Sequence, residues 1–163
     1  MIGMIQPDPN GEAGTAVYRT GCANRITQFR KVSDCLIEMV LTGVCRFDIG
    51  QELSTTRGYR LILPDWSRFA DDYLDHAELL QGSQEPLMKT LQHFFDIKGY
   101  EADLTMLRQL SAARLVDSLT MVLPFDTAEK QMLLETLNPE QRLANFIALI
   151  DGDFDVSDSV TRH

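Results

Sequence analysis

Residues 21–53 read GCANRITQFRKVSDCLIEMVLTGVCRFDIGQEL, and this stretch decides the fold. Residues 24–29 can form a strand, and residues 31–34 are typical of the turn that follows it. Residues 36–42 are apolar on both faces apart from Glu38, which predicts a central strand covered on both sides.

A second strand pattern follows Gly43. Apolar residues there alternate with charged ones, and this period of two predicts one buried face and one solvated face. The apolar positions are Cys45, Phe47 and Ile49, and the charged ones are Arg46 and Asp48. Residues 1–5, 15–19 and 59–63 predict further short strands. Because the connections have hairpin length, we expect a small antiparallel barrel or sandwich.

The period becomes helical after an Asp-rich connection at residues 65–82. Pro86 suits the first turn of a helix and Gly99 suits its end. Asp126 with Glu129 resembles a capping box. Further starts are expected at Asp103, Ser111 and Asn138, and an end at Gly152. The predicted inward positions are Leu87, Leu91, Phe94, Phe95, Leu104, Leu107, Leu110, Leu115, Leu119, Val122, Leu143, Phe146, Ile147 and Ile150. Strands followed by helices predict an α+β fold with segregated halves.

Composition indicates a folded, soluble chain. Of the 163 residues, 44% are apolar and 24% are charged, which allows a real core and argues against wholesale disorder. No apolar run approaches membrane-spanning length, and no secretory signal precedes the first strand. The three cysteines have no CxxC spacing, so reduced thiols and a cytoplasmic location are expected.

The net charge of −9 is unevenly distributed. Residues 1–64 carry seven Lys/Arg and six Asp/Glu, a net of +1, whereas residues 65–163 carry eight and eighteen, a net of −10. Because affinity for phosphates rests on Lys and Arg, the second half is expected to repel nucleic acid.

Two blocks of sequence carry a family resemblance. GCANRI, LTGVCRF, QEL and GYR, in this order, resemble the N-terminal, substrate-binding domain of Lon proteases. LPFDTAEKQMLLETLNPEQRLANFIALI resembles the helical bundle of the same domain. The resemblance implies a PUA-like antiparallel β-barrel, complete or incomplete, followed by a helical bundle. It also implies a stand-alone bacterial protein of this domain type, which is common in the family.

We expect the barrel at residues 1–66, a connecting loop at 67–82, the bundle at 83–152 and an acidic disordered tail at 153–163. Members of the family usually open with strands and a helix ahead of the segment that resembles residues 2–6, and this opening is absent here. A truncated gene, a late start codon and a shortened variant all remain open. The missing strands predict an unpaired barrel edge, and hence poor solubility or self-association through that edge.

The catalytic modules of Lon proteases are not carried over. No G-x-x-x-x-G-K-[ST] loop occurs to bind ATP, and none of Lys31, Lys89 and Lys130 lies in a segment that resembles the Ser–Lys protease. We therefore expect no enzymatic activity, no catalytic residue and no cofactor.

Other candidate chemistry has a simpler structural explanation. A DDxxD magnesium pattern is matched by Asp71, Asp72 and Asp75, but the sequence has no second acidic motif to complete the site. The first half of a calcium loop is matched by Asp151, Asp153 and Asp155, but the Gly and Glu that such a loop requires are absent. His76, His93 and His163 share no ligand spacing. Cys22 and Cys45 fit packing better than nucleophilic chemistry. No metal is expected.

The remaining clue is aromatic. Trp66, Phe69 and Tyr73 lie in the barrel-to-bundle connection and are predicted to line a groove for apolar polypeptide. Packing of the connection itself is the alternative. We therefore expect a binding module that recognises unfolded or apolar polypeptide, or a protease or adaptor partner, at the junction of the two halves.

Three other hypotheses stay open. An RNA-binding PUA-like protein would use the basic residues of the first half, although acidic neighbours largely cancel their charge. A gene fragment without independent function is the second, and an enzyme is the third. The basic residues are Arg25, Arg30, Lys31, Arg46, Arg57 and Arg60.

Overall fold

The computed structural model describes residues 1–11, 16–56, 58–73, 80 and 82–160, with the backbone alone for residues 153–160. The chain divides into two compact units, Met1–Leu74 and Asp75–His163. Each unit is described by itself below.

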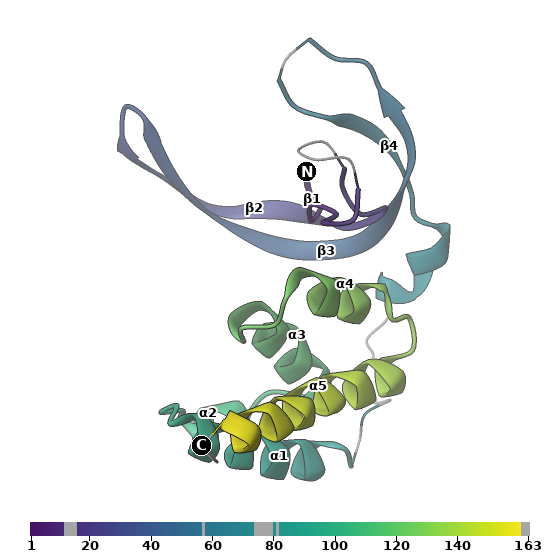
Figure 1. Ribbon diagram of the computed structural model, residues 1–163. Coiled ribbons are helices and arrows are strands. Elements are labelled where there is room, and N and C mark those ends of the chain that lie inside the picture. The colour runs from purple at the N-terminus through teal and green to yellow at the C-terminus, as the bar shows by residue number, and fades with distance from the viewer. Residues whose placement is uncertain (12–15, 57, 74–79, 81, 161–163) are drawn as a thin grey trace. The chain divides into compact units, whose positions relative to one another are not determined.

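The first unit is built on one antiparallel sheet. Its strands are β1 (Ile2–Met4), β2 (Thr20–Ser33), β3 (Leu36–Leu53) and β4 (Leu61–Asp65), in the order β1-β2-β3-β4. The described strands form a curved, open sheet in which β1 and β4 do not pair with each other (Figure 1). Strands followed by helices confirm the expected α+β fold, with the barrel incomplete.

β3 is a single strand of 18 residues rather than the two predicted on either side of Gly43. The strand continues because a β-bulge absorbs the irregularity: Asn24 pairs with Gly43 and Ala23 with Cys45, which leaves Val44 as the extra residue. A bulge bends a strand without ending it. The strand predicted at residues 15–19 is a single bridge between Pro7 and Val17, and residues 12–15 lie outside the described range.

The core of this unit is small and lies where all four strands meet. Cys45 and Phe47 are buried, as their alternation predicts. Gly21 is required beside them, because a Cβ there would lie 2.6 Å from the Met4 carbonyl oxygen and 3.0 Å from the Phe47 ring. Trp66 meets Phe47 edge to face, with ring centroids 5.7 Å apart.

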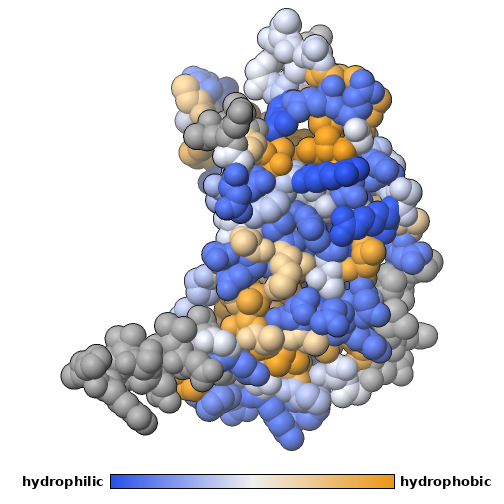
Figure 2. Space-filling model, turned by 45° about the vertical axis from the view of Figure 1, so that its right-hand side comes forward, coloured by the Kyte–Doolittle hydropathy of each residue, from blue (hydrophilic) through white to orange (hydrophobic). Residues whose placement is uncertain are grey.

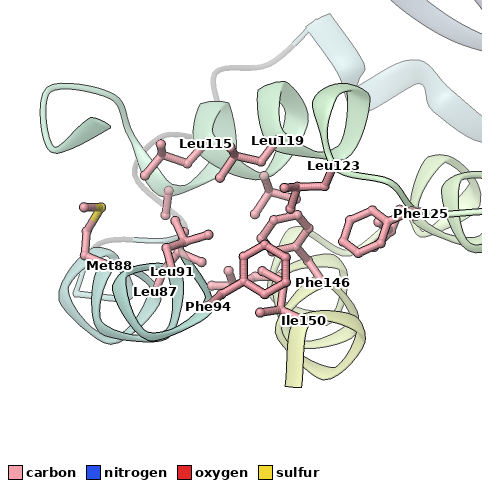
Figure 3. Packing of buried hydrophobic residues seen from close by; sticks show 14 of the residues in the cluster. Leu87, Met88, Leu91, Phe94, Leu115, Leu119, Leu123, Phe125, Phe146 and Ile150 are labelled. Carbon is pink, nitrogen blue, oxygen red and sulfur yellow. The ribbon is translucent and has the colours of Figure 1, made fainter. Parts of the chain in front are cut away.

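The second unit is helical. It contains α1 (Gln84–Lys98), α2 (Leu104–Leu107), α3 (Ala112–Val122), α4 (Thr127–Glu135) and α5 (Pro139–Val160). The predicted apolar face of α1 is buried, and side chains of α1, α3 and α5 point toward one another in the core (Figure 3). The fully buried centre includes Leu87, Leu91, Phe94, Leu115, Phe146 and Ile150.

Two helical predictions were wrong. Val122 is exposed, because α3 ends there and Leu123 turns into the core in its place. The last helix does not end at Gly152 but continues to Val160. Within the described residues, no helix is both long enough and apolar enough to cross a bilayer.

Candidate functional site

The distal halves of β2 and β3 form a two-stranded hairpin that projects from the sheet (Figure 1). β1 pairs only with Cys22, Ala23 and Asn24 of β2, and β4 pairs only with the end of β3 from Asp48 onward. Among the described strands, nothing else pairs with the hairpin. Its two strands therefore support only each other.

The residues of this hairpin are sorted onto two faces by a β-bulge. Ile26 pairs with Leu41 and Gln28 pairs with Val40, so Thr27 is an extra residue on β2. An extra residue shifts the alternation of side chains by one position. Ile26 and Phe29, which are three residues apart, are thereby placed on the same side.

The first side is an apolar face. We use the term apolar face for Ile26, Phe29, Ile37, Met39 and Leu41, which the register places together. Leu41 is half-buried, and the other four expose between 43% (Met39) and 63% (Phe29) of their surface. The prediction that residues 36–42 form a covered central strand is therefore wrong. β3 is central only at its other end, where β4 joins it.

The opposite side of the hairpin carries the exposed Leu36 and Val40 together with polar residues that pair with one another. Arg30 binds Glu38 with an Nη2–Oε2 distance of 2.5 Å. The hydroxyls of Thr27 and Thr42 lie 3.1 Å apart, and that of Thr27 also donates to the Val40 carbonyl at 3.2 Å. The Arg30–Glu38 and Thr27–Thr42 contacts hold the two strands together without using the apolar face. Lys31, whose cross-strand partner is Ile37, lies at the end of the apolar face, and its ammonium pairs with Asp34 at the tip.

The outer edge of β3 is open from residue 36 to residue 44 within the described part of the sheet. Since the Val40 carbonyl receives a hydrogen bond from Thr27 of β2, the backbone polar groups of Val40 point toward β2. Those groups alternate along a strand. The N–H groups of Ile37, Met39 and Leu41 therefore point toward the open edge.

The open edge ends at a carboxylate. Asp72 accepts a hydrogen bond from the Arg46 backbone N–H at 2.8 Å and binds its guanidinium through both carboxylate oxygens, at 2.5 and 2.9 Å. Arg46 is thereby largely covered, although the sequence predicts a solvated position. The same is true of Asp48, which is buried and accepts a hydrogen bond from the Thr20 hydroxyl at 2.5 Å.

The three aromatic residues predicted for binding lie in or next to the 3-10 helix η1 (Ser67–Tyr73), which contacts β3. Trp66 is half-buried against Phe47. Phe69 is buried, with the guanidinium carbons of Arg46 and Arg68 at 4.7 and 5.0 Å from its ring centre. Tyr73 is exposed. The three residues therefore do not form one exposed aromatic surface.

Tyr73 lies next to Cys45 and interacts with its thiol. Burial, offset in part by this hydrogen bond, raises the pKa of the Cys45 thiol, and burial also raises the pKa of Cys22. The hydrogen bond to Cys45 in turn raises the pKa of the Tyr73 phenol. A raised pKa keeps a thiol protonated at neutral pH, and the thiolate is the nucleophile. Cys22 and Cys45 are thus poorly suited to nucleophilic chemistry.

The basic residues of the first unit are mostly paired with carboxylates. In addition to Arg30, Lys31 and Arg46, Arg60 binds Glu52 at 2.6 Å. This ion pair lowers the pKa of Glu52. Arg57 lies outside the described residues. The pairing removes much of the positive field that binding to phosphates requires.

Other expected positions carry no assembled chemistry. Among the described residues, no group of three or more His, Cys, Asp or Glu could hold a metal ion. Asp72 of the DDxxD pattern binds Arg46, and His93 is exposed on α1. Leu74, Asp75, His76 and His163, and the side chains of Asp153 and Asp155, lie outside the described range.

Apolar side chains elsewhere on the surface are more scattered. On the face seen in Figure 2, apolar areas are broken up by hydrophilic ones. Leu61 and Leu63 of β4, for example, are exposed on one face, but the cross-strand partner of Leu63 is the polar Gln51. The apolar face of the hairpin differs because its exposed residues occupy consecutive cross-strand positions.

Comparisons with known proteins agree on one family. The model of the ATP-dependent protease La (LON) substrate-binding domain matches residues 2–152. The N-terminal domain of the Mycobacterium avium complex Lon protease is similar in structure, with a TM-score of 0.63 and 17% identity, over 91% of this chain and 77% of that one. A Lon N-terminal domain protein from Xanthomonas campestris has a TM-score of 0.55 and 21% identity, over 81% and 68%. No curated protein matches.

Proposed function

This chain belongs to the family of ATP-dependent protease La (LON) substrate-binding domains, and from that premise we propose that it binds exposed apolar segments of unfolded polypeptide. Binding is an equilibrium without covalent chemistry. The observation that carries the proposal is the apolar face of the hairpin, which is exposed although its residues are those of a core strand.

The size of the apolar face supports a binding role. Four of its five residues expose between 43% and 63% of their surface, and a contiguous exposed apolar patch of roughly 300–600 Å², the largest on a typical monomer, is often functional. Stable protein–protein interfaces bury about 800 Å² on each partner. The face therefore suits a weak, reversible complex with a short segment, as recognition of many unrelated polypeptides requires.

We propose supporting roles for the aromatic residues of the η1 region. Tyr73 is exposed beside Cys45, where the open edge of β3 ends, and can extend the bound surface. Trp66 is half-buried, and the exposed part of its ring can contact the bound segment. Phe69 acts by holding η1 against β3, because its ring is buried beside Arg46 and Arg68.

The partner is proposed to be polypeptide rather than RNA. The ion pairs of Arg30, Lys31, Arg46 and Arg60 with carboxylates favour this choice. A folded protease or adaptor would use the same apolar face but would not require the partner to be unfolded. The free thiols of the chain are consistent with action in a reducing compartment such as the cytoplasm.

Binding of fluorescein-labelled β-casein, followed by fluorescence anisotropy, tests the proposal. Wild-type protein should bind with an affinity that changes little with salt. Phe29→Ala removes the most exposed ring of the apolar face and should weaken binding about tenfold, the effect of losing roughly 1.4 kcal/mol at an interface anchor. Trp66→Ala should weaken it less.

Val122→Ala is the matched control, because Val122 is also exposed but lies in the helical unit. Its affinity should equal that of wild type. Absence of β-casein binding by wild-type protein would refute the proposed function. An equal loss in Phe29→Ala and Val122→Ala would remove the apolar face from the site.

A further inference from the structure

In the hairpin, the backbone of β3 is regular, whereas that of β2 is interrupted by bulges. Two residues of the hairpin have no cross-strand partner in the register, and both lie on β2. They are Thr27 and Val32. Bulges and lysines blunt an edge against strand addition. β3 from residue 36 to residue 43 carries no bulge, no proline and one charged residue, Glu38. It is therefore the edge that can accept another strand.

We propose that the bound polypeptide segment adds to the sheet as an extended strand along the outer edge of β3 at residues 36–44. The inference rests on the proposed function and specifies how that ligand is held. The N–H groups of Ile37, Met39 and Leu41 donate to the carbonyl groups of the segment, as in other complexes formed by strand addition.

The length of the segment is limited at both ends. The hairpin turn precedes Leu36, and the carboxylate of Asp72 occupies the edge at Arg46. At about 3.3 Å per residue, the open stretch spans roughly 30 Å and accommodates a segment of about eight or nine residues. Tyr73 lies at the Asp72 end, where it can cover a side chain of the segment.

The two faces of the hairpin define the sequence that fits. An added strand continues both faces, so its alternate residues extend the apolar face beside Met39 and the opposite face beside Glu38 and Val40. Glu38 pairs with Arg30, and Val40 is exposed. The preferred segment is therefore uncharged, with apolar residues on the side of the apolar face and small polar or apolar residues on the other.

A second copy of this chain fits the edge less well. Each copy carries a net charge of −9, so two whole copies repel each other, although residues 1–64, which hold the edge, carry a net of only +1. The apolar face also comprises only five residues, whereas a stable interface involves roughly 20–30 residues on each partner. A neutral extended polypeptide avoids the charge repulsion, and a weak complex with a short segment needs no larger area.

Met39→Pro and Met39→Ala separate the backbone contribution from that of the side chain. Both variants remove the Met39 side chain from the apolar face, but only proline removes the outward N–H and places a ring at the edge. The Val40 groups that face β2 are unchanged in both. With β-casein as the probe, Met39→Pro should bind about tenfold more weakly than Met39→Ala. Equal affinities would overturn strand addition.

Amide hydrogen exchange of the wild-type protein keeps the test independent of how well the proline variant folds. The amides of Ile37, Met39 and Leu41 should exchange rapidly in the free chain. They should slow about tenfold when β-casein is present at ten times its Kd, whereas the Val122 amide should not change.

The outcomes distinguish the two proposals. If β-casein binds but these three amides are not slowed, strand addition is wrong and the proposed function stands. If β-casein does not bind, both fail. If the amides are already protected without β-casein at low micromolar protein concentration, where a monomer is expected, the edge is occupied by a second copy and the inference is overturned.

Discussion

The three free thiols have different surroundings. Cys45 is buried, Cys22 is half-buried and Cys35 is exposed in the hairpin turn. Burial raises the pKa of both Cys22 and Cys45. Reactivity follows the fraction of thiolate and access to the sulfur. Low accessibility and a raised pKa therefore both lower the reactivity of Cys22 and Cys45.

Alkylation with iodoacetamide at pH 8 should modify Cys35 first and Cys45 last. We expect a clearly lower rate at Cys45, because burial restricts access to its sulfur and its raised pKa lowers its thiolate fraction. Peptide mapping by mass spectrometry measures each site, and the unfolded chain in guanidinium is the control. Equal rates at Cys35 and Cys45 in the folded protein would contradict the placement of Cys45 in the core.

Thr27 shows why the apolar face could not be predicted from the sequence. Ile26 and Phe29 are three residues apart, and a strict period of two assigns them to opposite faces. The bulge at Thr27 brings them together. The alternation of Cys45 and Phe47 was correctly interpreted because no bulge separates them. The partners that cover Arg46 and Asp48 come from distant positions, so no local pattern indicated them.

Helix α4 begins with a reciprocal cap at Asp126. The Asp126 side chain accepts a hydrogen bond from the Glu129 N–H at 2.8 Å, and the Glu129 side chain accepts one from the Asp126 N–H at 2.7 Å. Phe125, directly before the cap, packs on Phe146 of α5. The cap thus fixes the start of α4 next to a core residue.

Asp126→Ala should lower the free energy of unfolding by about 1 kcal/mol, because it leaves N-terminal N–H groups of α4 without a partner. Asp126→Asn is the control and should lose less, since its side-chain oxygen can still cap the helix. Urea unfolding followed by circular dichroism measures both. A loss in the asparagine variant equal to that in alanine would argue against the cap.

At the level of elements, the helices were more predictable than the strands. The core of the helical unit is formed by faces with a helical period, such as Leu87, Leu91 and Phe94, and the caps are local. Whether a strand is covered depends on which other strands reach it. Residues 36–42 have the composition of a covered strand, but no described strand pairs with their outer edge, and most of their apolar side chains are exposed. Their exposure could be observed only in the structure.

At the scale of the whole molecule, net charge and the open sheet have opposite effects on self-association. The edge of β3, with which no described strand pairs at residues 36–44, favours contact between copies. The charge of −9 and the small apolar face oppose it. We therefore propose that self-association is weak and competes with polypeptide for the same edge.

Light scattering coupled to size-exclusion chromatography should show a monomer at low micromolar concentration. A dimer should appear at higher concentration or in 1 M salt, which screens the repulsion. Excess β-casein should suppress the dimer. A stable dimer at all concentrations and salt levels would show that copies of the chain, rather than client polypeptide, cover the edge.

The central claim is that polypeptide contacts the apolar face of the hairpin. Photo-crosslinking tests it most directly, with a benzophenone amino acid placed at Phe29 in one protein and at Val122 in another. Both positions are exposed, but only Phe29 belongs to the face. Irradiation with β-casein should give a crosslinked product from position 29 and none above background from position 122. Equal crosslinking at both positions, or crosslinking from position 122 alone, would contradict the account.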